Sequence, residues 1–154
     1  GDGMDSDAIR LATAGDLAVV EEVVNSAYAH YTARIGRKPG PMLDDHAARI
    51  AAGQTHLLER DGAMLGLIVL IPQPDALLVE NVAVSPAAQG LGLGRRLMDF
   101  AETRARAAGL PRLRLYTHVA MVENQAIYAR LGYAETRRVI EAGLHRIYME
   151  KPLA

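Results

Sequence analysis

Apolar and polar residues alternate with two different periods in the first third of the chain. Residues 9–13 alternate like a strand, and residues 17–28 carry apolar side chains at helical spacing. Glycine and proline are concentrated in residues 31–42, where we expect a loop or a broken helix before a short helix over residues 44–52. A strand followed by helices is therefore expected in this part of the chain.

Strand patterns dominate the middle of the chain. Residues 55–60, 63–71 and 76–84 form three largely apolar runs, and the Asp61-Gly62 pair between the first two is a hairpin signal. The second and third runs are separated by a proline-containing break. These features predict three consecutive antiparallel strands.

The last third of the chain combines helices and strands. Helical spacing over residues 93–108 precedes a strand-like segment at residues 113–117, so a βαβ crossover is implied. A further helix is expected over residues 122–131, and residues 133–140 and 144–151 are expected to form a hairpin. The elements together predict an α/β (α+β) fold with a mixed sheet.

Composition is that of one soluble domain. The sequence has 154 residues, 50% of them hydrophobic, and a formal net charge of −1. A chain of this size can bury a substantial hydrophobic core and does not need disulfide bonds for stability. Residues 1–3 precede Met4 and are expected to be an expression remnant, which leaves residues 4–154 as a single domain.

The same composition argues against several classes of protein. With no cysteine, the chain has no disulfide, no thiolate metal site and no cysteine nucleophile, and we expect no metal cofactor. The balanced charge argues against nucleic acid as a partner. The longest strongly apolar run, residues 64–71, is far shorter than the ~20 residues that span a bilayer, so no membrane anchor and a cytoplasmic location are expected.

A glycine-rich connection between the strand at residues 76–84 and the following helix is the strongest chemical signal. Gly90, Gly92 and Gly94 alternate with leucines, which lets a ligand approach the backbone closely. Free N–H groups at a helix N-terminus attract phosphate, so a pyrophosphate is a suitable ligand. The spacing does not match the dinucleotide fingerprint or the P-loop.

A second signal lies in the helix at residues 122–131. Asn124 and Tyr128 are one helical turn apart and project from one side, while Ile127 and Leu131 form an adjacent apolar stripe. The helix therefore combines a packed face with a polar face that carries an amide and a phenol.

Together the two segments resemble the GNAT superfamily of acyl-CoA-dependent N-acetyltransferases. The family motif Q/R-x-x-G-x-G/A corresponds here to residues 89–94, and the later Asn…Tyr helix ends in Leu-Gly-Tyr. The order of elements is also similar over nearly the whole chain. The resemblance implies a mostly antiparallel sheet of about six or seven strands, splayed between its fourth and fifth strands and flanked by about four helices.

The resemblance also implies which residues bind acetyl-CoA, the expected co-substrate. A backbone N–H of the strand segment Val82, Ala83 and Val84 would stabilise the thioester oxygen. Asn124 would bind the pantetheine or its thioester end. The pyrophosphate would lie on Gln89, Gly90, Leu91, Gly92, Leu93 and Gly94, with Arg95 reaching the phosphates and Arg96 a weaker candidate.

The expected reaction needs a base and an acid. Glu80 is the leading base, because it lies in an apolar strand where desolvation would raise its pKa. Alternation would place it on one side of the strand with Val82 and Val84. His118, Glu123 or a water molecule are the alternatives.

Tyr128 occupies the position of the family's general acid, which would protonate the departing thiolate of coenzyme A. With no cysteine and no matched Ser–His–acid pattern, direct transfer in a ternary complex is expected.

The acceptor is the least defined part of the sequence. Tyr28, Tyr31, Arg34 and His118 are candidate substrate residues, and this aromatic and basic mixture suits a small amine that also bears a carboxylate. A protein N-terminus or lysine remains an alternative acceptor, as does a non-catalytic acyl-CoA-binding or sensor role. A homodimer is a further expectation from the resemblance.

Overall fold

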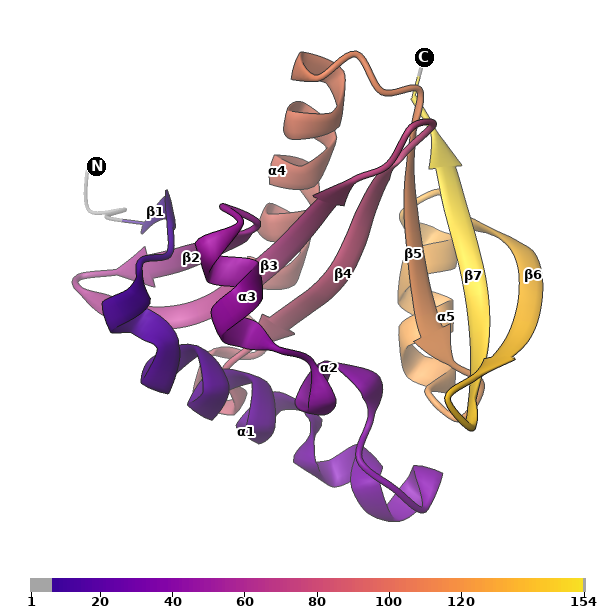
Figure 1. Ribbon diagram of the computed structural model, residues 1–154, viewed down its shortest axis with the longest axis horizontal. Helices are drawn as coiled ribbons and strands as arrows, with labels where there is room; N and C mark the ends of the chain where they lie inside the picture. Colours follow the sequence, from indigo (N-terminus) through magenta and orange to yellow (C-terminus); the bar gives the residue numbers. More distant parts are fainter. Residues whose placement is uncertain (1–6, 154) are drawn as a thin grey trace.

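The computed structural model describes residues 7–153, so the expectation for residues 1–3 lies outside the described part of the chain. The seven strands of its sheet have the order β1-β2-β3-β4-β5-β7-β6 (Figure 1). The strands are β1 (Asp7–Leu11), β2 (Thr55–Arg60), β3 (Ala63–Pro72), β4 (Leu77–Val84), β5 (Arg112–His118), β6 (Ala134–Glu141) and β7 (Leu144–Pro152). The α-helices are α1 (Leu17–Ile35), α2 (Gly40–Leu43), α3 (His46–Ala51), α4 (Leu93–Ala107) and α5 (Val122–Arg130), with short 3-10 helices η1 (Ala14–Asp16) and η2 (Pro86–Ala88).

The sheet is mixed and opens at its centre. Every pair of neighbouring strands is antiparallel except β4 and β5, which are connected by the crossover helix α4. These two strands pair only over Leu77–Val79 and Leu113–Leu115. In Figure 1 they meet at the top of the view and diverge toward the bottom. The predicted mostly antiparallel sheet, splayed between its fourth and fifth strands, is confirmed.

Two apolar cores hold the helices against the sheet. Val20 and Val24 of α1 pack on one face with Leu57 and Leu67, while Leu97 of α4 belongs to the core of the other face. These five side chains are fully buried, which β-strand alternation and the helical spacing together require. The helices that pack on the two faces of the sheet flank the gap where β4 and β5 diverge (Figure 1).

The first helix is longer than its pattern predicts. α1 continues to Ile35, so residues 31–35 are helical rather than part of the expected loop or broken helix. The helix ends where Gly36 adopts a left-handed conformation with φ 86°, and its N–H donates to the carbonyl of Thr32. Buried Tyr31 explains the extension, because packing against the fold stabilises the last turns.

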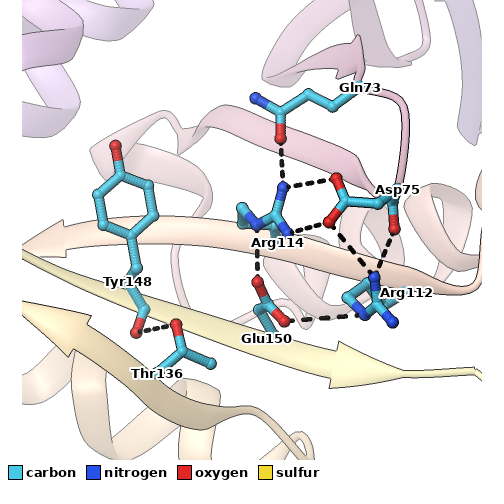
Figure 2. Close-up of polar contacts among 7 residues, drawn as sticks. All are labelled: Gln73, Asp75, Arg112, Arg114, Thr136, Tyr148 and Glu150. Atoms are coloured by element: carbon cyan, nitrogen blue, oxygen red, sulfur yellow. Dashed lines mark hydrogen bonds and ion pairs between the residues drawn. The ribbon is translucent and has the colours of Figure 1, made fainter.

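The paired end of β4 and β5 is held by a cluster of polar side chains (Figure 2). Arg114 of β5 donates to Glu150 of β7 at 2.7 Å, to Gln73 at 2.6 Å and to Asp75 at 2.8 Å. Arg112 donates to the backbone carbonyl of Asp75 at 2.8 Å. The turn between β3 and β4 is thereby tied to β5 and β7, so the sheet is closed at this end and open at the other.

No helix among residues 7–153 is both long and apolar enough to cross a membrane.

Candidate active site

The glycine-rich connection has the geometry of an anion cradle. Gly90 and Gly92 have φ values of 86° and 76°, a conformation that a Cβ would strain. Gly92 caps α4 without a side chain, and the first hydrogen bond of the helix runs from the N–H of Arg96 to the Gly92 carbonyl at 3.1 Å. The N–H groups of Leu93 and Gly94 in the first turn therefore have no partner within the helix.

A groove of about 490 Å³ begins at this cradle and runs between α1, β4 and α5. Its wall includes these residues expected to bind the coenzyme: Val82, Ala83, Val84, Gln89, Gly90, Gly92, Leu93, Gly94, Arg95, Asn124 and Tyr128. Leu91 does not line the groove, and its side chain is 54% exposed. The hydrophobic wall from Met98, Ile127 and Leu131 was not predicted, because its apolar spacing is equally typical of a core.

A second, smaller cavity of about 40 Å³ lies at the opening in the sheet, between the diverging parts of β4 and β5. Glu80, Tyr116, His118 and Arg146 line it, together with residues 39–41. The cavity and the groove share four wall residues, Tyr28, Val82, Asn124 and Tyr128. The groove and the cavity thus adjoin where β4 and β5 diverge, and together they are called the passage below.

Glu80 stands at a β-bulge in β4. Val79 pairs with Leu70 and Asn81 pairs with Val69, so Glu80 is the extra residue without a partner on β3. The bulge reverses the alternation, because Val79 and Val82 both pack against the core of the α4 face. The expected grouping of Glu80 with Val82 and Val84 on one side is therefore wrong.

The bulge turns Glu80 into the small cavity. Its Oε1 accepts a hydrogen bond from the Tyr116 hydroxyl at 2.7 Å. Burial raises the pKa of Glu80, and Asp44 adds to the rise, while the Tyr116 hydrogen bond, Arg49 and Arg146 oppose it. A carboxylate with a raised pKa is a stronger base than an exposed one.

The alternative bases are engaged elsewhere. The Nδ1 atom of His118 accepts from the N–H of Ala120 at 3.0 Å, and burial lowers the pKa of this histidine. Glu123 is exposed and accepts from Arg34 at 2.6 Å, and this contact lowers the pKa of Glu123. The Nδ1 lone pair of His118 is thus occupied by a hydrogen bond. The carboxylate of Glu123 is paired with the Arg34 guanidinium, which makes it a weaker proton acceptor.

Tyr128 lies in the wall shared by the groove and the cavity. Burial raises the pKa of Tyr128 to about 12, so the phenol keeps its proton at neutral pH. Its ring contacts that of Tyr133 with centroids 5.9 Å apart. Asn124 lies one turn earlier in the same shared wall, as the helical spacing predicts.

The substrate candidates from α1 have three different positions. Tyr28 lies in the shared wall, and its hydroxyl is 2.9 Å from the Val82 carbonyl and 3.0 Å from Asn81 Oδ1. Tyr31 lines the large groove, and Arg34 lines neither space, since it bridges to Glu123 and to the Ala120 carbonyl. The hydrogen bonds of Tyr28 brace α1 against the open edge of β4.

The two arginines after the glycines also differ. Arg95 lies in the wall of the groove beside the cradle. Arg96 does not line the groove, and it donates to the carboxylate of Asp7 in β1 at 3.0 Å. Arg95 is therefore the arginine placed to meet a phosphate.

Comparison with known proteins adds a family to this geometry. The model described as "Acetyltransferase (GNAT) family" matches residues 20–133. The chain is 47% identical over 64 residues to the N-alpha-acetyltransferase 80 of Mus musculus, covering 42% of this chain and 19% of that protein. It is 39% identical over 77 residues to an IAA acetyltransferase of Azospirillum brasilense, covering 49% of this chain and 50% of that protein. The matches thus span half or less of these relatives' own length.

Solved structures share the whole fold. A PaiA N-acetyltransferase from Thermoplasma acidophilum in complex with coenzyme A aligns with a TM-score of 0.78 at 19% identity, over 96% of this chain and 99% of that one. An acetyltransferase from Elizabethkingia anophelis with acetyl-CoA bound aligns with a TM-score of 0.73 at 18% identity, over 97% and 99% of the two chains. At this identity the likeness concerns the fold.

Proposed function

Because the chain belongs to the GNAT acetyltransferase family, we propose that it transfers an acetyl group from acetyl-CoA to the primary amine of a small molecule. The observation that carries this proposal is the passage at the opening between β4 and β5. A groove of about 490 Å³ and a small cavity with a half-buried carboxylate meet there at Tyr28, Val82, Asn124 and Tyr128.

The groove suits acetyl-CoA from end to end. Its cradle offers the free N–H groups of the first turn of α4, the positive end of the helix dipole and Arg95, which together complement a pyrophosphate. Apolar side chains of α4 and α5 line the part beyond the cradle, where a pantetheine arm would lie. Its thioester end would reach the wall shared with the small cavity.

The residues at this junction can perform each step of the transfer. Glu80 takes a proton from the ammonium group, and the freed nitrogen attacks the thioester carbonyl carbon to form the new C–N bond. Within the described residues, β4 has no partner strand on the β5 side beyond Val79. N–H groups alternate in direction along a strand, and the N–H of Ser85 donates to Leu65 of β3. The backbone N–H groups of Val82 and Val84 can therefore face the developing oxyanion. When the C–S bond breaks and the carbonyl re-forms, Tyr128 protonates the thiolate of coenzyme A, and the second proton lost by the nitrogen restores the Tyr128 hydroxyl.

The size of the cavity favours a small acceptor. A volume of about 40 Å³ has room for an amino group and a few further atoms. Glu80 and Arg146 in its wall also suit an amine with a separate anionic group, as the sequence suggests.

A panel of acceptors tests the proposal. The purified chain is incubated with acetyl-CoA and alkylamines, aralkylamines, polyamines, α-amino acids, or peptides with a free N-terminus or lysine, and acetylated products are identified by mass spectrometry. We expect acetylation of a small amine. Acetylation of peptides alone would contradict a small-molecule acceptor and indicate a protein acceptor. Binding of acetyl-CoA without any acetylated product would support a sensor role.

A further inference from the structure

Tyr116 of β5 is a second tyrosine at the opening, and it lies on the acceptor side. It comes directly after Leu115, the last residue of β5 that pairs with β4. Its side chain therefore reaches across the beginning of the gap, where its hydroxyl donates to Glu80 Oε1 at 2.7 Å. This hydrogen bond directly connects the two diverging strands at the level of the proposed base.

The Tyr116 hydroxyl acts as a permanent donor. Burial and the charge of Glu80 raise the pKa of this phenol far above its ordinary value, so it stays protonated throughout the working range of an enzyme. Because one Glu80 oxygen accepts this bond, the carboxylate is fixed in rotation about its last torsion. Its other oxygen has no hydrogen-bond partner among residues 7–153 and remains able to accept a proton from an amine.

Tyr116 is itself held in place by the hairpin of β6 and β7. The guanidinium of Arg146 lies over its ring, 4.2 Å from the centroid, and donates to Glu141 at 3.0 Å. Tyr148 packs beside it, with ring centroids 5.7 Å apart, and donates to the same Glu141 oxygen at 2.8 Å. The aromatic ring therefore has little freedom to move away from Glu80.

The charged groups around Glu80 come from several elements. Asp44 precedes α3 and is paired with Arg49 of α3 at 3.0 Å, and Arg146 reaches in from β7. Asp44 favours a protonated Glu80, while the two arginines favour its ionised form. Tyr116 differs from these groups because it touches the carboxylate directly and carries no charge itself.

We propose that Tyr116 is a positioning residue that orients Glu80 and keeps it ionised for proton transfer. The inference rests on the proposed function, in which Glu80 is the base. In this role Tyr116 takes no proton itself and acts through Glu80. It holds one carboxylate oxygen so that the other faces the amine, and it offsets part of the effect of burial on the ionised form.

The Tyr116→Phe variant tests this role without requiring a known acceptor. The carboxyl carbon of Glu80 is followed by ¹³C NMR as a function of pH in the labelled chain, with Glu80→Gln used for assignment. Loss of the Tyr116 donor should raise the pKa of Glu80. The control is Tyr148→Phe, which removes a hydroxyl from the neighbouring ring but none that contacts Glu80, and it should leave the titration of Glu80 close to that of the wild type.

The kinetic consequence separates positioning from packing. With the best acceptor of the panel, Tyr116→Phe should move the acid limb of kcat/KM to higher pH, and each unit of movement lowers the rate on that limb about tenfold. The KM for acetyl-CoA should stay near the wild-type value. A uniform loss of rate at all pH values with an unchanged Glu80 titration would overturn the role of Tyr116.

The proposed function and this inference fail in different ways. If Glu80→Gln retained full activity, Glu80 would not be the base, and the proposed mechanism would fall whatever Tyr116 does. If Glu80→Gln were inactive while Tyr116→Phe and Tyr148→Phe titrated and reacted alike, the base would stand and Tyr116 would not position it. Circular dichroism of each variant checks that the fold is kept.

Discussion

At the scale of residues, burial affects the two proposed catalytic groups in complementary ways. It raises the pKa of Glu80, which makes this carboxylate a better proton acceptor, and it raises the pKa of Tyr128, which keeps this phenol a proton donor. Both side chains line the same small cavity. Glu80 is therefore placed to take a proton from the amine, and Tyr128 to give one to the departing thiolate. The wall of the passage thereby supplies both a base and an acid for the proposed reaction.

Replacement of Glu80 by glutamine should lower kcat by about 10²-fold or more, because an amide cannot accept the proton. In the wild type, activity should fall as the pH drops through the raised pKa of Glu80, since the base must be ionised to act. The pH–rate profile of the variant should lack this limb. The matched control is Glu135→Gln, which changes an exposed carboxylate paired with Arg138 on β6 and should react like the wild type.

Replacement of Tyr128 by phenylalanine should lower kcat by about tenfold, because a thiol of ordinary pKa near 8.5 needs only moderate help to leave. The dissociation constant of acetyl-CoA, measured by calorimetry, should change little. Tyr133→Phe is the control, since this neighbouring hydroxyl is buried without a hydrogen-bond partner among the described residues. An unchanged rate for Tyr128→Phe, when chemistry limits turnover, would remove Tyr128 from the acid role.

Local spacing predicted some site residues, and long-range contacts determined the rest. Asn124 and Tyr128 were predictable because helical spacing places them on one side of α5. The contact between Tyr116 and Glu80 joins two strands that are far apart in the sequence, so no local pattern indicates it. The side to which Glu80 points was mispredicted because the bulge adds one residue to the alternation.

At the scale of elements, the connection from β4 to α4 is the part whose backbone geometry matters most for binding the proposed ligand. Its left-handed glycines let the chain turn so that the first N–H groups of α4 face the groove. This turn was predictable from the sequence because left-handed backbone strongly favours glycine, which stands here at alternate positions. The C-terminal half of α1 was less predictable, because tertiary packing extends the helix to Ile35 beyond its clear apolar pattern.

The Gly90→Ala variant should weaken acetyl-CoA binding, because a Cβ at φ 86° forces the loop to shift its N–H groups. The control is Gly53→Ala, which introduces a comparable strain at φ 71° after α3, away from both the groove and the cavity. Both variants should lose about 1 kcal/mol of unfolding free energy. Calorimetric titration with acetyl-CoA should distinguish them, and equal affinities would contradict the cradle.

At the scale of the whole molecule, the proposed function depends on a sheet that is closed at one end and open at the other. The cluster around Arg114 holds the closed end, and the cores on the two faces hold the helices that flank the opening. Sequence patterns predicted the succession of strands along the chain and the crossover, but not the order β5-β7-β6 at one side of the sheet. The width of the opening depends on side-chain packing throughout the molecule, which a linear pattern does not encode.

Replacement of Leu97 by alanine should lower the free energy of unfolding by about 2–5 kcal/mol, because it leaves a cavity in the core between α4 and the sheet. Leu97 is fully buried. Leu43→Ala is the control, because that side chain is 57% exposed. Urea denaturation should show a change of at most about 0.5 kcal/mol for the control. Equal stabilities for the two variants would contradict the assigned core.

The most direct test of acetyl transfer is the release of the coenzyme A thiol, followed with a thiol reagent while a small primary amine is titrated into a mixture of the chain and acetyl-CoA. The protein contributes no background because the sequence contains no cysteine. We predict that release rises with amine concentration to saturation and is nearly abolished by Glu80→Gln. Release that is independent of every amine tested would contradict the account.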